Sequence, residues 1–287
     1  MATLKIAVTG ATGQLGHKVI EQLKAIVPIE QIVALVRTPE KASGFGVEVR
    51  AFDYTNPSLI AESLIGIDRL VLISSNEIGQ RAVQHTNVIN GAKVAGVQHI
   101  VYTSLLHADI STLDLAPEHL ETETVLKSSC INYTILRNGW YTENYTGSVA
   151  GWISGGAVTG SAGEGKISSA SREDFALALA KVVTGEGHEG EVYELAGDEA
   201  YTLTELAEEL SHQTGKEIPY NNLSEEGYTE TLKSWGVQEG LSAAIAGWDI
   251  AVSKGDLFDN GKALSALIGR STTPLKQSIT LALENIK

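Results

Sequence analysis

Three glycines stand near the start of the chain, Gly10, Gly13 and Gly16 in "VTGATGQLG", directly after an apolar run. A strand that turns through glycine into a helix leaves unpaired backbone N–H groups at the helix N-terminus, which suits a phosphate. Gly10 permits the tight turn, Gly13 lets a pyrophosphate approach the backbone, and Gly16 lets the helix pack against the strand. The turn is therefore predicted to bind a dinucleotide, with a plain strand-to-helix turn as the alternative. The predicted binding residues are Gly10, Ala11, Thr12, Gly13, Gln14 and Leu15.

The residue at the end of the second apolar run decides which dinucleotide fits. An acidic residue there accepts a hydrogen bond from a free ribose 2′-OH, whereas a 2′-phosphate calls for arginine. "VALVR" ends in Arg37, Lys41 follows soon after, and no acid stands at this position. A guanidinium can bind a phosphate through two parallel hydrogen bonds. The pattern favours NADP, with a solvated surface charge as the alternative for Arg37.

Small polar residues follow the fourth apolar run, which ends in "LISS". Ser74, Ser75 and Asn76 would let the backbone pass beside the phosphates and the second ribose of the cofactor. Asp53 closes the third run, "VRAF". It can accept a hydrogen bond from the adenine amino group or cap its own turn, and the sequence leaves both interpretations open.

Alternation of short apolar runs with helix-like stretches predicts the elements that position these residues. The runs are continuous in apolar residues rather than alternating, which is typical of a parallel sheet covered on both faces. We therefore predict an α/β fold with a Rossmann-type doubly wound parallel sheet. The six runs are "KIAVTG", "QIVALVR", "GVEVRAFDY", "DRLVLISS", "QHIVYTSL" and "NYTILRN".

The second half keeps one more β-like run, "EVYELAG", and is otherwise helical, as in the capped helix "TLTELAEELSHQTG". We expect a smaller, mostly helical C-terminal lobe, joined by a flexible glycine-rich connection from Gly155 to Gly165. The predicted division is residues 1–150 with 185–200 for the nucleotide-binding domain, and 151–184 with 201–287 for the lobe on the substrate side.

Composition excludes several classes of function. The chain has 287 residues and a formal net charge of −14, from 21 Lys and Arg against 35 Asp and Glu, with no basic run, which argues against nucleic acid as a partner. No apolar segment is long enough to span a membrane, and Met1 to Lys5 has no signal-peptide character, so a cytoplasmic protein is expected. One cysteine and seven scattered histidines give no metal-ligand spacing. A homodimer stays open.

Four stretches together, "VTGATGQLG", "VALVR", "LISS" and "YTILRNGWYTEN", resemble the NmrA-like branch of the atypical short-chain dehydrogenases. Within that branch the chain is most similar to the flavin-free bacterial NAD(P)H:quinone oxidoreductases, with triphenylmethane reductase a near relative, and the similarity covers essentially the whole chain. The resemblance implies NADPH in a groove of the Rossmann domain, no flavin and no metal, and a quinone between domain and lobe.

Carried over by position, the resemblance also implies which residues face the nicotinamide. They follow the sixth apolar run, with Asn144 close behind, and are Asn138, Gly139, Trp140, Tyr141, Thr142 and Glu143. Arg172, in "SASREDFA", is expected either to reach into the cleft or to belong to an ordinary helix cap.

The chain departs from the wider short-chain dehydrogenase pattern in its proton donor. None of its nine tyrosines is followed by lysine four residues later, and the corresponding helix instead carries His119 and Glu123 on one face, as a catalytic dyad or as a structural pair. A quinone is electron-poor and its hydroquinone anion is stabilised by the ring, so it needs little acid catalysis. The prediction is direct hydride transfer from NADPH to a quinone without flavin; the alternative is a redox-sensing regulator of the NmrA type.

Aromatic residues after the sixth apolar run are candidates for the acceptor pocket. Trp140, Tyr141 and Tyr145 can stack on a flat quinone or close the core between the two parts. Trp248 and Phe258 are predicted as a lid or as core. Tyr102 and His107 are candidate proton sources, and no catalytic residue is assigned.

Overall fold

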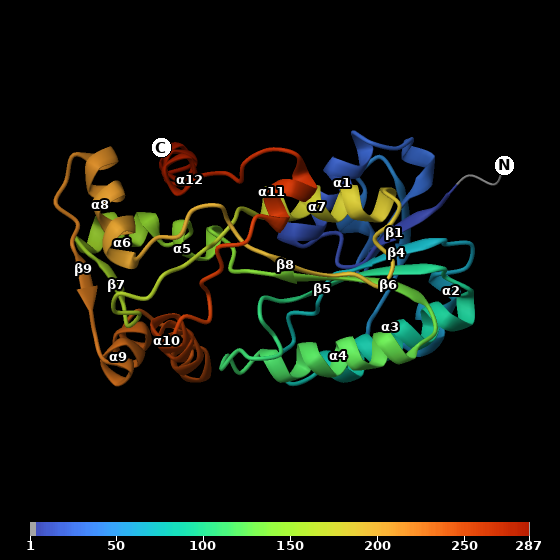
Figure 1. The fold of residues 1–287 in the computed structure, drawn as a ribbon, viewed down its shortest axis with the longest axis horizontal. Coiled ribbons are helices and arrows are strands. Elements are labelled where there is room, and N and C mark those ends of the chain that lie inside the picture. Colours follow the sequence, from blue (N-terminus) through green and yellow to red (C-terminus); the bar gives the residue numbers. More distant parts are fainter. Residues whose placement is uncertain (1–3, 287) are drawn as a thin grey trace.

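The computed structural model describes residues 4–286; Met1 to Thr3 and Lys287 lie outside the described residues, so the expectation about the start of the chain is not tested. A parallel sheet of seven strands runs through this part, in the order β3-β2-β1-β4-β5-β6-β8 (Figure 1). The predicted doubly wound α/β class is confirmed. The strands are β1 Ile6–Val8, β2 Ile32–Val36, β3 Glu48–Ala51, β4 Arg69–Leu72, β5 His99–Leu105, β6 Asn132–Asn138 and β8 Val192–Leu195.

Helices cover both faces of the sheet, so successive side chains of a central strand are buried in opposite layers. In β1, Ile6 and Val8 belong to one apolar cluster, and Ala7 belongs to the other. This explains why the central strands β1 and β2 are continuous in apolar residues. One layer holds α1 Gln14–Lys24, α7 Arg172–Thr184 and α11 Ala263–Ile268, and the other holds α2 Pro57–Ser63, α3 Arg81–Ala95 and α4 Ala116–Ser128 (Figure 1). Two short 3-10 helices, Ile29–Gln31 and Pro39–Ala42, flank β2.

The glycine turn joins β1 to α1 as the spacing predicts. Gly10 has φ +58°, in the left-handed region that favours glycine. Gly13 directly precedes the first helical residue, Gln14. A Cβ at Gly16 would overlap the Gly10 carbonyl oxygen, so glycine lets this helix approach the turn.

A second lobe lies beyond the carboxyl end of β6 and, within residues 4–286, is mostly helical, as expected (Figure 1). Its two strands pair in parallel. The predicted capped helix is α8, where Thr202 and Glu205 form a reciprocal cap and Gly215 ends the helix with φ +67°. The elements are α5 Glu143–Thr146, α6 Val149–Gly155, β7 Val158–Gly160, α8 Leu203–Thr214, β9 Tyr220–Asn222, α9 Glu225–Ser234, α10 Glu239–Ser253 and α12 Leu275–Glu284.

The expectation of a flexible connection from Gly155 to Gly165 is wrong. This segment contains β7, whose three residues are buried. A Cβ at Gly160 would come within 2.7 Å of Asp249 Oδ2 and within 2.9 Å of a Leu203 methyl group. Glycine therefore serves close packing in this strand, and the glycine content alone gave no sign of it.

The chain crosses between the two parts more than once. Helix α7 packs against α1, and α11 packs against α7, so both lie on the sheet. The packing therefore favours assigning these two helices to the nucleotide-binding part. The predicted division, 1–150 with 185–200 against 151–184 with 201–287, stays a prediction.

The two glycines of the turn should differ in their tolerance of alanine. Gly16→Ala places a methyl group against backbone and should destabilise the protein by about 1–3 kcal/mol. Gly13→Ala is the matched control, because its Cβ would lie 3.1 Å from Gly10 O and its φ is −76°, so it should cost less than about 1 kcal/mol. Urea unfolding measures both free energies. Equal costs would contradict the close approach at Gly16.

Candidate active site

The loops that follow the parallel strands meet at one edge of the sheet, where ligands bind in this class of fold. Tyr54, which follows β3, holds the start of the glycine turn in place. Its buried hydroxyl lies 2.7 Å from Thr9 Oγ1 and 2.8 Å from the carbonyl oxygen of Ile73. Thr9 Oγ1 in turn accepts a hydrogen bond from the Ile73 N–H. Tyr54 has no signal in the sequence, because its partners follow two other strands, β1 and β4.

Arg37 lies at the carboxyl end of β2, and 63% of its side chain is exposed. Its Nη1 is 3.2 Å from Oε1 of Glu77, which stands just after the predicted wall of Ser74 to Asn76. Both partners are largely in solvent, so the pair contributes about 1 kcal/mol or less and leaves the guanidinium available to a phosphate. The predicted role of Arg37 toward a 2′-phosphate is not tested by this contact.

Asp53 caps its own turn. Its carboxylate accepts hydrogen bonds from the Thr55 N–H at 2.9 Å and from the Thr55 hydroxyl at 2.7 Å. The backbone hydrogen bond from Thr55 is the main cause of a lowered Asp53 pKa. The structure therefore shows the turn cap, and a contact of Asp53 with the adenine amino group stays a prediction.

The wall that follows β4 is held by its neighbours. The Ser74 N–H donates to Thr103 Oγ1 at 2.8 Å, and the Ser75 N–H donates to Nε2 of His85 at 2.9 Å. The Ser75 carbonyl accepts from Nε of Arg81 at 2.6 Å. These contacts fix the backbone that is predicted to pass beside the cofactor.

Side chains at this edge have buried polar atoms without hydrogen-bond partners among residues 4–286. Among these atoms are Nη1 of Arg81 and both amide atoms, Oδ1 and Nδ2, of Asn138. An unpaired buried polar group is costly, so such atoms point to a polar ligand. Together with the glycine turn, they fit the polar groups of a dinucleotide. Asn138 was predicted from the resemblance, whereas Arg81 was missed because it falls within an ordinary helical pattern.

The segment after β6 leaves the sheet in a fixed path. The Gly139 N–H donates to the Leu195 carbonyl at 2.7 Å, and the Thr142 N–H donates to the Ala170 carbonyl at 2.9 Å. The predicted nicotinamide-facing residues, Asn138 to Glu143, therefore form one continuous stretch between the sheet and the second lobe. Their contact with the cofactor stays a prediction.

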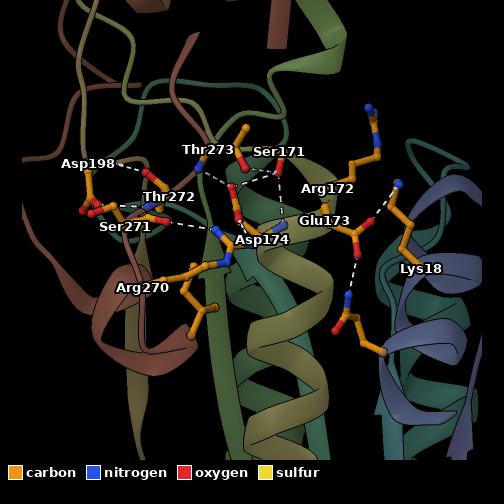
Figure 2. A network of polar contacts seen from close by, with 12 residues as sticks. Lys18, Ser171, Arg172, Glu173, Asp174, Asp198, Arg270, Ser271, Thr272 and Thr273 are labelled. Atoms are coloured by element: carbon orange, nitrogen blue, oxygen red, sulfur yellow. Dashed lines mark hydrogen bonds and ion pairs between the residues drawn. The ribbon is translucent and has the colours of Figure 1, made fainter. Parts of the chain in front are cut away.

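Arg172 begins α7 beside a network of polar contacts (Figure 2). Ser171 caps this helix, because its Oγ accepts a hydrogen bond from the Asp174 N–H at 3.1 Å. The buried Asp174 carboxylate pairs with Nη2 of Arg270 at 2.7 Å and accepts from the Thr273 N–H at 2.8 Å. The network fastens the C-terminal part of the chain to the helix that carries Arg172.

The Arg172 side chain reaches the segment after β6. Its guanidinium carbon lies 4.3 Å from the centre of the Tyr141 ring, and Nη2 donates to Asn144 Oδ1 at 3.0 Å. Glu143 accepts a hydrogen bond from the Arg172 backbone N–H at 3.0 Å. Since Ser171 provides the cap, the side chain of Arg172 is free to order the stretch that is predicted to face the nicotinamide.

His119 and Glu123 share a helix face but do not form a dyad. Nδ1 of His119 is 2.7 Å from the Tyr102 hydroxyl, and Glu123 instead makes two hydrogen bonds of 2.9 Å with Arg137. Burial lowers the pKa of His119 to about 3, so its imidazole is neutral at physiological pH. Burial would raise the pKa of Glu123, but the hydrogen bonds from Arg137 and Ser104 lower it.

The two candidate proton sources are already engaged. Tyr102 is fully buried, faces His119, and has a pKa raised by burial. His107, at φ +52°, has Nε2 3.0 Å from Oδ2 of Asp259. Neither side chain lines the cavity described next.

A cavity of about 810 Å³ lies in the second lobe, next to the segment after β6. The four tryptophans of the chain all line it. Rings of Trp140 and Trp248 meet edge to face at 5.5 Å, and Nε1 of Trp248 donates to Asp114 at 2.8 Å. We call it the tryptophan cavity; its aromatic lining consists of Trp140, Tyr145, Trp152, Tyr228, Trp235 and Trp248. Phe258, predicted as lid or core, does not line it and is partly exposed.

One carboxyl group stands in this apolar lining. Asp249 is 8% exposed, and its Oδ2 accepts a hydrogen bond from the Ser161 N–H at 2.8 Å. Burial raises the pKa of Asp249 to about 6, and the hydrogen bond from Ser161 opposes this only in part. Asp249 was not among the predicted site residues. Its place as the single acid in the apolar stretch "SAAIAGWDIAV" could have indicated a buried carboxyl group.

Comparison with known proteins identifies the family. Residues 10–186 match the family described as NAD(P)H-binding. The chain belongs to the NmrA-like, NAD(P)H-binding family. It is 55% identical to quinone oxidoreductase 2 of Escherichia coli (strain K12) over 278 residues, which cover 96% of this chain and 97% of that protein.

Solved structures agree with this membership. The NADPH-dependent quinone oxidoreductase of Escherichia coli complexed with NADPH has a TM-score of 0.95 and 54% identity, over 97% of this chain and 99% of that one. Triphenylmethane reductase of Citrobacter sp. complexed with NADP(H) has a TM-score of 0.93 and 41% identity, over 97% of this chain and 100% of that one. Within residues 4–286, no three or more His, Cys, Asp or Glu side chains are grouped so that they could hold a metal ion. No helix in this part of the chain is long and apolar enough to cross a membrane.

The buried carboxyl of Asp249 should make stability depend on pH. Its folded pKa of about 6 lies above the value of about 3.9 expected in the unfolded chain, so its contribution is complete below about pH 4 and is lost as pH rises through about 6. As pH rises from about 4 to above about 6, the unfolding free energy of Asp249→Asn should therefore increase by about 3 kcal/mol relative to that of the unmodified protein. Urea unfolding across this range measures the difference. The exposed Glu226→Gln is the control, and a difference for Asp249→Asn that does not vary with pH contradicts the assignment.

Proposed function

We propose that the protein reduces quinones with NADPH, by direct hydride transfer and without flavin. The proposal rests on the tryptophan cavity. Its lining includes Trp140, within the stretch predicted to face the nicotinamide, and Asn144, directly after that stretch. Aromatic walls suit a flat ring system, and the volume is within the range of small-molecule sites. The NADPH-dependent quinone oxidoreductase of Escherichia coli, at 54% identity, supports the same reaction.

NADPH is proposed to lie across the carboxyl edge of the sheet. Gly10 to Leu15 would hold the diphosphate, Arg37 the 2′-phosphate, Ser74 to Asn76 the middle of the cofactor, and Asn138 to Glu143 with Arg172 the nicotinamide side. When bound, NADPH supplies the hydride that reduces the quinone. The chain's own residues bind and orient both partners, and the aromatic lining of the cavity keeps water away from the acceptor.

The absence of the tyrosine and lysine pair favours a quinone over an alcohol or ketone. A quinone carbonyl is electron-poor and its reduced anion is stabilised by the ring, so orientation contributes more than acid catalysis. We propose the cytoplasm as the place of reaction, in keeping with a chain that has a single cysteine. A homodimer stays a prediction.

The test is NADPH consumption by the purified protein with a simple benzoquinone and a naphthoquinone. No flavin is added, the protein spectrum is checked for flavin, and boiled protein serves as control. Saturable, protein-dependent turnover is the expected result. Tight NADPH binding with no turnover of any quinone would contradict the proposal and favour a nucleotide-sensing regulator.

Replacing Arg37 should separate the two nicotinamide cofactors. Arg37→Glu removes a charge-assisted contact of roughly 1.5–3 kcal/mol, so NADPH affinity should fall about ten- to a hundredfold. NADH lacks the 2′-phosphate and should be affected less. Calorimetric titration with each cofactor measures this, with the exposed Lys93→Glu, in α3, as the control for a reversed charge. Equal loss for NADPH and NADH would contradict the assigned role.

A further inference from the structure

Within residues 4–286, the tryptophan cavity is lined by a single carboxyl group. Among the described residues that line it, Asp249 is the one Asp or Glu, and Lys, Arg and His do not occur there. Asp249 follows Trp248 directly in α10, and both residues line the cavity. An acid in an apolar ligand cavity is costly to keep and calls for a chemical reason.

One oxygen of this carboxyl accepts a hydrogen bond from the backbone, and the other has no hydrogen-bond partner among residues 4–286. Oδ2 accepts a hydrogen bond from the Ser161 N–H, just after β7. Gly160 makes room for it, because a Cβ there would come within 2.7 Å of Oδ2. No hydrogen bond to Oδ1 occurs within residues 4–286, although Asp249 is more than nine-tenths buried. The backbone just after β7 therefore holds the carboxyl in place and leaves Oδ1 for a ligand in the cavity.

The groups that face Asp249 favour its protonated form. The neighbouring titratable side chains are Tyr145 of α5, Tyr220 of β9 and Tyr228 of α9. Burial raises the pKa of each tyrosine, that of Tyr220 to about 12, so these hydroxyls keep their protons. No Lys, Arg or His within residues 4–286 lines the cavity to stabilise a carboxylate. A carboxyl in such surroundings can act as a proton donor near neutral pH.

We propose that Asp249 is the proton donor to the quinone, acting through Oδ1. This inference rests on the proposed quinone reduction. The quinone takes up a hydride from NADPH and one proton from Asp249, so the O–H bond at Oδ1 breaks and an O–H bond forms on the quinone oxygen. The products are the hydroquinone, NADP⁺ and the Asp249 carboxylate, to which solvent returns a proton.

The decisive variant is Asp249→Asn, because the amide keeps an oxygen for the Ser161 N–H and has no proton to give. The pH profile of kcat/KM is measured for both proteins with NADPH and a naphthoquinone. In the unmodified protein kcat/KM should fall about tenfold for each pH unit above about 6, until it reaches the level at which water alone donates the proton. The variant should stay at that level throughout. The exposed Glu226→Gln should follow the unmodified profile.

Two further readouts do not depend on turnover. Quenching of tryptophan fluorescence by the naphthoquinone should give similar affinities for both proteins, since the walls of the cavity are unchanged. Infrared pH-difference spectra should show a protonated carboxyl band that disappears with a midpoint near 6, shifts when the quinone binds, and is missing in Asp249→Asn.

The outcomes distinguish this inference from the proposed function. Quinone turnover with the same rate and pH profile in both proteins, or a carboxyl band that ignores the quinone, would overturn the role of Asp249 alone. If the unmodified protein reduces no quinone, the proposed function fails and the donor role fails with it. A variant that binds the naphthoquinone much more weakly, with an unchanged pH profile, would make Asp249 a binding group and contradict proton donation.

Discussion

The close passage of Gly139 beside β8 is the constraint on which both halves of the site depend. Its N–H donates to the Leu195 carbonyl at 2.7 Å, and a Cβ there would lie 3.0 Å from that oxygen. The chain can therefore leave the sheet at this point, with Asn138 on the side predicted to hold the cofactor and Trp140 in the wall of the tryptophan cavity. One short stretch thus joins the predicted cofactor groove to the proposed acceptor cavity.

The two sides of this stretch differ in polarity, and the difference suits their tasks. The edge of the sheet presents unpartnered polar atoms of Arg81 and Asn138, which a polar cofactor would satisfy. The cavity presents aromatic rings and the single carboxyl of Asp249. A charged dinucleotide is therefore favoured on one side and a flat apolar acceptor on the other.

Local patterns predicted the sheet and the glycine turn, because strand burial and turn geometry depend on neighbours in sequence. What the sequence could not give depends on contacts between distant segments. Gly160 looked like part of a flexible connection, but it makes room for the carboxyl of Asp249. His119 and Glu123 have the spacing of a pair, yet His119 hydrogen-bonds to a residue of β5 and Glu123 to a residue of β6. The tryptophans are dispersed in sequence, and only the fold brings them to one cavity.

We propose that the cofactor groove and the tryptophan cavity form one active site. A crystal structure of the protein with NADP⁺ and a naphthoquinone would test this arrangement. We expect the nicotinamide beside Asn138 to Glu143, and the quinone against Trp140 and Trp248 within hydrogen-bonding distance of Asp249 Oδ1. Quinone bound at another place, with the tryptophan cavity holding only water, would show that the two are not one site.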